Sequence, residues 1–400
     1  MASVNKKMAE LGNVRSVIRD IFEYGNQRAK EIGRENIFDF SLGNPSVPSP
    51  NCLTEEIISL CENNDPVALH GYTSAVGAED VREAIANDIN LRFNAGVTKN
   101  DIYMTCGAAA SLTVTLNALT CEGDSIVAIA PFFPEYRVFA EAAGATLSVV
   151  PANTKDFTVD LNAFEKAITP SVKAVIVNSP NNPTGVVIPP KTIKEMCRIL
   201  KAKEEEYAHP IFLISDEPYR ELVYDETTEV PYLMNEYDDT VVCYSFSKSL
   251  SVPGERIGYI AVSGKMKEHD DVFAAVCGSG RALGFVCAPS MMQRVVSKCL
   301  GKTSDLEVYK TNRDILYEAL TSYGFECVRP DGAFYLFVKS PEEDATAFSL
   351  KARKHELLIV PSDSFGCPGY VRISYCVQTD MLKRSLPAFK KLAEEYGLTK

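Results

Sequence analysis

The sequence is short of the residues and runs that build metal sites and membrane spans. It has no tryptophan and only four histidines, His70, His209, His269 and His355, none of which lies near another or near a pair of cysteines. Its twelve cysteines include no Cys-x-x-Cys spacing, so the usual pattern of a zinc site is absent. No stretch approaches the roughly 18 consecutive apolar residues that a transmembrane helix needs.

Other absences limit where in the cell the protein is expected and which partners it is expected to bind. The first twenty residues carry charges throughout and hold no apolar core, unlike a secretory signal peptide. Lysine and arginine number 41 against 53 aspartate and glutamate, a net charge of −12, which disfavours nucleic acid or an anionic membrane as the main partner. We therefore expect a cytoplasmic protein with reduced cysteines and no nucleic-acid or membrane partner, whose local cations serve a small anion.

Strand-like runs alternate with helical patterns over most of the chain. Short, β-branched runs that are apolar on both faces lie at 125–131, 172–177, 211–215, 240–244 and 256–262, and helical patterns lie at 81–93, 109–119, 161–168 and 192–207. This alternation predicts an α/β fold with a mostly parallel sheet covered by helices on both faces. Ligands of such sheets bind at the carboxyl ends of the strands. No predicted strand is followed by Gly-x-Gly-x-x-Gly, which disfavours a dinucleotide-dependent dehydrogenase.

The last third of the chain has a different pattern. Amphipathic helices predicted at 306–323 and 381–396 bracket strand-like runs at 333–338, 356–360 and 370–375. An N-terminal helix at 14–32 and a strand at 38–42 are expected to pack with them. We therefore expect a large cofactor-binding domain over residues 49–285 and a smaller α+β domain made of residues 1–48 and 286–400.

One lysine stands among three serines directly after the strand predicted at 240–244. The segment runs from Ser245 through Ser247, Lys248 and Ser249, and Arg256 follows eight residues after the lysine. A lysine at a strand end is a candidate Schiff-base former, and the hydroxyls and guanidinium are a candidate phosphate cradle. Pyridoxal 5′-phosphate is a cofactor that needs an aldehyde and a phosphate held together. Alone, the segment fits a solvated turn with a surface lysine equally well.

Two further strands run into polar residues. The run at 175–177 enters an Asn- and Pro-rich loop that contains Asn182, whose amide could donate to a ligand oxygen, although Asn-Pro pairs are also ordinary in turns. The run at 211–215 ends in Asp216, a carboxylate that is costly to bury unless a cation, such as a pyridinium nitrogen, meets it. Tyr219 lies three residues on, within reach of a ring's phenolic oxygen. A helix N-cap is an equally good interpretation of Asp216.

Two weaker signals complete the set. Gly107, Ala108 and Ala109 open the helix predicted to continue to residue 119, and backbone N–H groups at such a start can bind phosphate, although small residues there also serve packing. Arg372 lies in a run that alternates like a strand. It either points to solvent or forks onto a carboxylate.

In this order along nearly the whole chain, these segments resemble the class I/II aminotransferases, the fold-type I, aspartate aminotransferase superfamily of pyridoxal-phosphate enzymes. The most specific matches are the Asn-Pro-Thr-Gly loop at 182–185 and the Ser-x-Ser-Lys…Gly-x-Arg-x-Gly stretch at 245–258. The resemblance implies a three-layer α/β fold and an aminotransferase (EC 2.6.1.-) that moves an amino group from an L-amino acid to a 2-oxo acid. The scheme is ping-pong, between aldimine and pyridoxamine forms of the cofactor.

The resemblance also implies a role for each matched residue. Lys248 would carry the internal aldimine and then move the substrate proton as a neutral amine, with a depressed pKa. Asp216 would hold the pyridine nitrogen. The other implied ligands are Asn182 and Tyr219 for the phenolic oxygen, Phe133 for stacking on the ring, Ala108, Ala109, Ser245, Ser247 and Arg256 for the phosphate, and Gly43, Asn182 and Arg372 for the substrate carboxylate.

Tyr72 matches the family tyrosine that reaches the phosphate of the neighbouring subunit, which implies a homodimer. Ala110 stands where some aspartate-specific relatives have a lysine, so neutral or broad specificity is expected, with Arg281 as a candidate partner for an acidic side chain. On the same fold, a C–S β-lyase or an amino acid β-decarboxylase is the alternative. A cofactor-fold protein that binds without catalysis is disfavoured, because Lys248 is present.

Overall fold

The computed structural model describes residues 4–13 and 17–399, and the chain divides into two compact units. The smaller unit contains Met1–Asn44, Val308–Arg329 and Phe334–Lys400, and the larger contains Pro45–Glu307 and Pro330–Ala333. This division differs from the expected one, in which residues 286–307 belong to the smaller domain. These residues stay with the larger unit because helix α12 (Ser290–Lys298) packs against helix α3 (Asn51–Asn63) and helix α5 (Glu79–Phe93) in its core.

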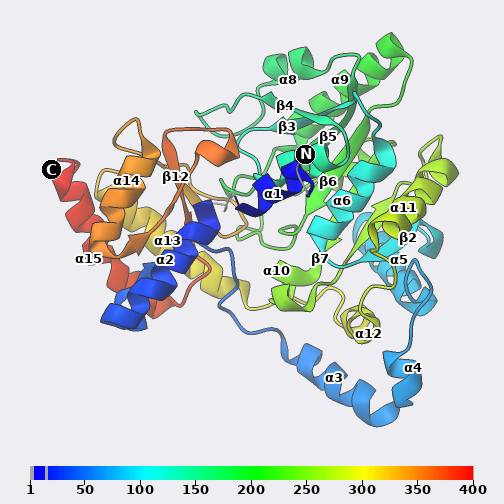
Figure 1. Ribbon diagram of the computed structural model, residues 1–400, viewed down its shortest axis with the longest axis horizontal. Helices are drawn as coiled ribbons and strands as arrows, with labels where there is room; N and C mark the ends of the chain where they lie inside the picture. The colour runs from blue at the N-terminus through cyan, green and yellow to red at the C-terminus, as the bar shows by residue number, and fades with distance from the viewer. Residues whose placement is uncertain (1–3, 14–16, 400) are drawn as a thin grey trace. The chain divides into compact units, whose positions relative to one another are not determined.

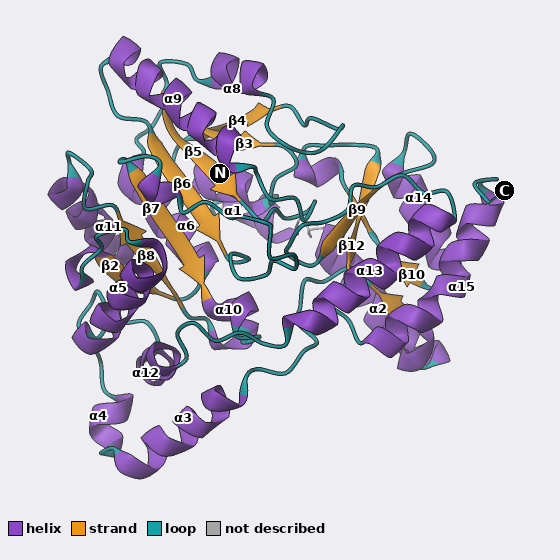
Figure 2. Cartoon of the chain, turned by 180° about the vertical axis from the view of Figure 1, so that it is seen from behind, coloured by secondary structure: helices purple, strands orange, loops and turns teal. Residues whose placement is uncertain are grey.

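A seven-stranded sheet forms the centre of the larger unit, with strand order β2-β8-β7-β6-β5-β3-β4. The strands are β2 (Ile102–Thr105), β3 (Ser125–Ile129), β4 (Thr146–Val150), β5 (Val172–Asn178), β6 (Phe212–Glu217), β7 (Thr240–Ser245) and β8 (Gly258–Val262). Figure 2 shows β5, β6 and β7 side by side. The predicted mostly parallel sheet is therefore confirmed.

Strand β8 departs from the expected parallel arrangement, because it pairs antiparallel with both β7 and β2. The chain between β7 and β8 holds only helix α10 (Phe246–Ser249) and a 3-10 turn at Pro253–Glu255. It lacks a crossover helix that could carry it back to the other edge of the sheet. The chain therefore re-enters the sheet in the reverse direction, and this keeps residues 246–257 at the carboxyl edge of the parallel strands.

Helices cover both faces of this sheet, as the apolar strands predict (Figure 1). Helices α6 (Ala108–Leu119), α7 (Glu135–Ala142) and α11 (His269–Leu283) share one core with the strands. On the other face, α8 (Leu161–Ala167) and α9 (Pro190–Tyr207) form a second core, and α3, α5 and α12 form a third. Because side chains alternate along a strand, Ile214 of β6 joins the α6 core and Leu213 joins the α9 core.

The smaller unit has the expected α+β composition. Its strands are β1 (Phe38–Asp39) paired parallel with β10 (Leu357–Leu358), and an antiparallel sheet of β11 (Val360–Pro361), β12 (Tyr370–Ser374) and β9 (Tyr335–Lys339). Its helices are α1 (Lys6–Asn13), α2 (Val17–Ile32), most of α13 (Leu306–Ser322), α14 (Ala345–Ala352) and α15 (Thr379–Glu395). Of the helix expected at 14–32, residues 14–16 lie outside the described residues.

A short helix, α4 (Pro66–His70), completes the larger unit. None of the helices in the described part of the chain combines the length and the hydropathy that a bilayer crossing requires.

Candidate active site

Polar residues gather at the carboxyl edge of the larger unit's sheet, where three neighbouring strands end. Asn178 at the end of β5 lies opposite Asp216 of β6, and Asp216 lies opposite Cys243 of β7. Ser245 ends β7 and caps helix α10, which carries Lys248. The sequence-predicted residues Asp216, Ser245 and Lys248 therefore belong to one edge of one sheet.

Asp216 is a buried carboxylate with one oxygen satisfied. Tyr136, on helix α7, donates a hydrogen bond to its Oδ2, and among the described residues no donor reaches its Oδ1. Burial raises the pKa of Asp216 to about 7, and the hydrogen bond from Tyr136 opposes that rise. Burial and the neighbouring carboxylate raise the pKa of Tyr136 well above its ordinary value, so its hydroxyl stays a donor. Oδ1 is thus a desolvated acceptor that suits a cationic N–H donor.

Asn178 connects Asp216 to the Asn-Pro-Thr-Gly loop. Its Nδ2 donates to the Asp216 carbonyl at 2.9 Å, and its Oδ1 accepts from the backbone N–H of Asn182 at 2.7 Å. Asn181 braces the loop from within, because its Oδ1 accepts from the backbone N–H and the hydroxyl of Thr184 at 3.1 and 2.8 Å. Asn182 is therefore buried on a loop tied to the strand of Asp216, rather than on a free surface turn.

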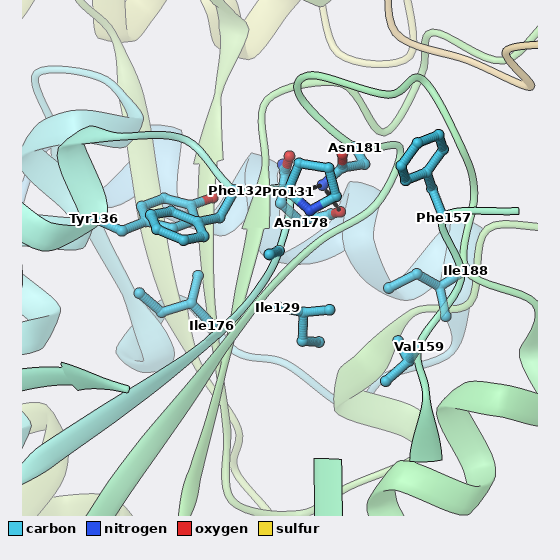
Figure 3. A pocket seen from close by; sticks show the side chains of 11 residues that line it. Ile129, Pro131, Phe132, Tyr136, Phe157, Val159, Ile176, Asn178, Asn181 and Ile188 are labelled. Carbon is cyan, nitrogen blue, oxygen red and sulfur yellow. Dashed lines mark hydrogen bonds between the residues drawn. The ribbon is translucent and has the colours of Figure 1, made fainter. Parts of the chain in front are cut away.

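A small cavity lies beside these residues, lined by Tyr136, Phe132, Pro131, Asn178 and Asn181 among others (Figure 3). Its volume of about 20 Å³ holds no more than a water molecule or two. Figure 3 shows the rings of Tyr136 and Phe132 lying against one another, with the two asparagines beside Pro131. This cavity is too small for a cofactor.

The start of helix α6 meets Arg256 and Ser245 in a cradle of small residues. A Cβ added to Gly107 would lie 2.8 Å from Nη2 of Arg256, and one added to Gly258 would lie 3.0 Å from the Gly107 Cα and 3.3 Å from the Ser245 Cα. The Ser245 hydroxyl donates to Ser247 Oγ at 2.8 Å. The structure therefore brings a helix N-terminus, hydroxyls and a guanidinium together, the combination that binds phosphate.

Three further predicted residues lie in the larger unit. Tyr219 is buried in the turn after β6, where its carbonyl accepts from the Leu222 N–H at 2.9 Å. The Phe133 ring packs edge-on against Tyr136, with ring centroids 5.8 Å apart. Lys248 is half-buried in α10, which overturns the interpretation of this segment as a solvated turn.

In the smaller unit, Arg372 is buried in strand β12 and does not point to solvent. It is 2% exposed, and its Nη2 donates to the Ser41 carbonyl at 2.6 Å. Its guanidinium carbon lies 4.7 Å from the Tyr335 ring centroid and 5.3 Å from that of Phe365. Gly43 adjoins the same tyrosine, because a Cβ there would lie 2.1 Å from the Tyr335 hydroxyl. The two predicted carboxylate ligands of this unit thus share one aromatic neighbour.

Comparison with known proteins identifies the family. The model of the family "Aminotransferase class I and II" matches residues 35–389 of this chain. The chain belongs to the class I and II aminotransferases. It is a transaminase, an enzyme that transfers an amino group from an amino acid to a 2-oxo acid.

Solved structures agree with this assignment. An amino transferase from Eubacterium rectale is 51% identical, covers 99% of this chain and 100% of its own, and superimposes with a TM-score of 0.97. The aspartate aminotransferase of Thermotoga maritima is 29% identical over 356 residues, 88% of this chain and 90% of its own. Its structure matches with a TM-score of 0.85 at 27% identity over 97% of this chain and 99% of its own. These relatives favour transamination over the β-lyase and β-decarboxylase alternatives and share the expected fold-type I architecture.

Other residues of this aminotransferase that the sequence singled out lie elsewhere on the larger unit. Tyr72 follows α4 and is 97% exposed. Arg281 is exposed in the last turn of α11, and Ala110 is buried near the start of α6. Within residues 4–13 and 17–399, no group of three or more His, Cys, Asp or Glu side chains is arranged to hold a metal ion.

Sequence reasoning missed two residues that touch the Asp216 segment, Tyr136 and Asn178. Neither belongs to a motif that names it. The available signal was position: Asn178 is the last residue of a buried strand, and Tyr136 follows the Pro-Phe-Phe-Pro segment at the carboxyl end of another. Polar residues at those ends face the site wherever the sheet is parallel.

Proposed function

We propose that this aminotransferase binds pyridoxal 5′-phosphate at the carboxyl edge of the larger unit's sheet. The observation that carries the proposal is the buried Asp216 carboxylate, whose Oδ1 has no donor among the described residues. When bound, the cofactor supplies an aldehyde that condenses with amines and a ring that withdraws electrons from the amino acid's Cα. The residues present fit such a group at both its ring and its phosphate.

Asp216 would hold the ring nitrogen. Burial favours the neutral acid in the protein alone, with a pKa of about 7, and a cationic N–H at Oδ1 would reverse that preference by pairing the charge. Tyr136 occupies Oδ2, so it fixes which oxygen is presented and in which direction. The pair would thereby keep the ring nitrogen protonated and the ring strongly electron-withdrawing.

The phosphate would be held by the cradle at Gly107. The backbone N–H groups of Ala108 and Ala109, the hydroxyls of Ser245 and Ser247 and the guanidinium of Arg256 offer donors to a dianion. The close approach of Gly107 to Arg256 supports this, because any side chain at residue 107 would fill the space beside the guanidinium.

The remaining residues of this edge would act on the ring and the proton. Lys248 Nζ would bind the aldehyde carbon and, when released by the incoming amino acid, hold and move the proton at the substrate Cα. Tyr219 and Asn182 would donate to the phenolic oxygen, and Phe133 would stack on the ring. Asn182 is supported in this role by the Asn178 bond, which fixes its backbone relative to Asp216.

In the smaller unit, Arg372 would clamp the substrate's α-carboxylate with its planar fork, together with Gly43. The aromatic rings of Tyr335 and Phe365 and the Ser41 carbonyl hold the guanidinium in a fixed orientation, which lowers the entropy cost of binding. For the rest of the substrate we propose neutral side chains, because Ala110 offers no charge near the start of α6.

We also propose a homodimer in which Tyr72 reaches the cofactor phosphate of the neighbouring subunit. The support is its 97% exposure, which leaves the whole side chain accessible to a second copy of the chain. A cytoplasmic location is proposed with it, because none of the twelve cysteines, all within the described residues, forms a disulfide bond.

An absorbance spectrum of the purified protein tests the function, taken before and after adding single amino acids with no 2-oxo acid present. The proposal expects a visible band that converts to a near-ultraviolet band with its amino donor, in a stoichiometric single turnover. In Lys248→Ala, that conversion should be lost, whereas the control Lys390→Ala, at an exposed position of α15, should behave as wild type. Steady accumulation of pyruvate and ammonia would instead indicate a β-lyase. If no band remains after pyridoxal 5′-phosphate has been supplied and the unbound cofactor removed by gel filtration, the cofactor assignment is overturned.

A further inference from the structure

The strand end that carries Asp216 has a second buried charge on the opposite face of the sheet. Glu217 follows Asp216 in β6, and its carboxylate is paired with Arg220 through two hydrogen bonds, Nε to Oε2 and Nη2 to Oε1, the latter at 2.7 Å. The two side chains are 2% and 5% exposed. Because successive strand residues face opposite sides, this ion pair lies behind the carboxylate proposed to meet the ring.

The pair is built into a site with further partners for each group. Ser215 donates its hydroxyl to Glu217 Oε1 at 2.6 Å. The other guanidinium N–H groups donate to the carbonyls of Val230 at 3.2 Å and Pro231 at 2.9 Å. Arg220 therefore joins the end of β6 to the 230–231 segment.

Aromatic rings complete the enclosure of the guanidinium. Its carbon lies 5.1 Å from the centroid of Phe93, at the end of α5, and 5.0 Å from that of Tyr232. The two rings stack on each other with centroids 4.3 Å apart. Besides the end of β6, the arginine thus contacts two separate segments of the larger unit, the end of α5 and residues 230–232.

Stability alone gives a poor reason for such a pair. Desolvating two charges costs about as much as their attraction returns, and replacement by apolar residues is often neutral or stabilising. What a bidentate ion pair adds is a fixed geometry between its two backbone positions. Here those positions are residues 217 and 220, and each directly follows a predicted cofactor ligand, Asp216 and Tyr219.

We infer that Glu217 and Arg220 are positioning residues, which lock the turn after β6 so that Asp216 and Tyr219 meet the ring of the cofactor together. This inference rests on the proposed function. It assigns the pair no contact with cofactor or substrate. Its effect is carried by the backbone from residue 217 to residue 220, and the 230–231 carbonyls hold that backbone from behind.

The test removes both charges together, in Glu217→Gln/Arg220→Met. The double variant and wild type are compared in three measurements. The cofactor-free proteins give the thermal midpoint and the dissociation constant of pyridoxal 5′-phosphate. The cofactor-loaded proteins give the pH midpoint of the visible band. We expect an unchanged or higher thermal midpoint, cofactor binding weaker by about tenfold, and a band midpoint displaced upward by about half a unit or more. The upward direction follows because a displaced Tyr219 donates less to the phenolic oxygen, which then holds a neighbouring proton more strongly.

A control removes another bidentate pair, the partly exposed Arg28–Glu356 of the smaller unit, as Arg28→Met/Glu356→Gln. It should leave cofactor affinity and the band midpoint unchanged. If the Glu217→Gln/Arg220→Met protein does not fold, Arg220→Lys decides, because it keeps the charge but loses the fork and should show the same two displacements in smaller degree.

The outcomes separate the inference from the function beneath it. Wild-type protein that never binds the cofactor overturns the proposed function. Wild-type protein that binds it, with variants of the Glu217–Arg220 pair that match its affinity and band midpoint, overturns the positioning role alone. A variant whose thermal midpoint collapses while its affinity and band midpoint stay at the wild-type values would assign the pair to stability and also overturn the inference.

Discussion

Asp216 and Arg372 are both buried charged residues in strands, but their surroundings differ in kind. Arg372 is held on several sides at once by the Ser41 carbonyl and the rings of Tyr335 and Phe365. Asp216 receives one hydrogen bond, from Tyr136, and its Oδ1 meets no donor among the described residues. An arginine keeps its charge at any ordinary pH, whereas a buried carboxylate does not. Arg372 is therefore charged and ready for an anion in the free protein, whereas Asp216 becomes fully charged only when a cation binds.

The largest expected effect comes from removing the charge that depends on a ligand. Asp216→Asn keeps the shape and the acceptor for Tyr136 but cannot pair with a protonated ring nitrogen. We expect kcat for transamination to fall by roughly 10³-fold or more, the scale of losing one preorganised charge at a reacting centre. Steady-state kinetics with saturating cofactor measure it. A loss below about tenfold would mean that Asp216 does not set the protonation of the ring.

A smaller effect on activity is expected from changing Arg372, whose charge is already held in place by its neighbours. Arg372→Lys keeps the positive charge but loses the planar fork and its fit between the aromatic rings. We expect KM for the amino acid to rise by roughly 10- to 100-fold with a smaller change in kcat, because the interaction serves substrate binding before and during the reaction. Cofactor affinity, measured on the same protein, should stay at the wild-type value. A loss of cofactor affinity would place Arg372 in a different role.

Tyr136→Phe sharpens the comparison by making Asp216 still less satisfied. The tyrosine hydrogen bond lowers the carboxyl pKa against the upward effect of burial, so its removal should raise the pKa of Asp216 above about 7. In cofactor-free protein, the pH at which cofactor affinity is half-maximal should move upward. Phe132→Leu, next to the same cavity but without a hydroxyl, is the control. An unchanged pH dependence in Tyr136→Phe would show that the hydrogen bond does not govern the carboxylate.

The raised pKa of Asp216 should also make the stability of the cofactor-free protein depend on pH. Its folded pKa of about 7 lies above the ordinary value near 4, so between these pH values the folded state binds more protons than the unfolded state. This contribution to stability is present below about pH 4 and is lost as pH rises to about 7. The free energy of unfolding of wild type relative to Asp216→Asn should therefore fall over that interval in urea titrations. A flat or rising difference would contradict a raised pKa.

The sequence predicted most of what its own patterns determine. The strands at 172–177, 211–215 and 240–244 and the helix opened by Gly107 are present within a residue or two of the expected bounds. Strands β2 and β4 went unpredicted: β2 has only four residues, and β4 lies at the sheet edge with a mixed burial pattern. The direction of β8 depends on how the 246–257 segment turns, which periodicity does not report.

The residues of the candidate site also fall into those that the sequence could single out and those that it could not. Asp216 and Arg372 could be singled out because a charge within or at the end of an apolar run is unusual. Lys248 could be singled out because it stands among serines directly after a predicted strand. Tyr136 could not be singled out, because it lies 80 residues from Asp216 in the sequence and only the folded sheet brings the two side chains into contact. The Glu217–Arg220 pair was equally hidden, since its significance lies in burial and in the face of the strand, and a Glu-x-x-Arg spacing is ordinary on any surface.

The most direct test of the central claim, that Asp216 meets a protonated ring nitrogen, is the ¹⁵N chemical shift of pyridoxal 5′-phosphate labelled at that nitrogen and bound to the enzyme. In wild type the shift should be that of a protonated ring, unchanged between about pH 7 and pH 9, because the paired carboxylate holds the proton. In Asp216→Asn it should be that of a neutral ring. A neutral ring nitrogen in wild type, or the same shift in both proteins, would contradict this assignment of the site.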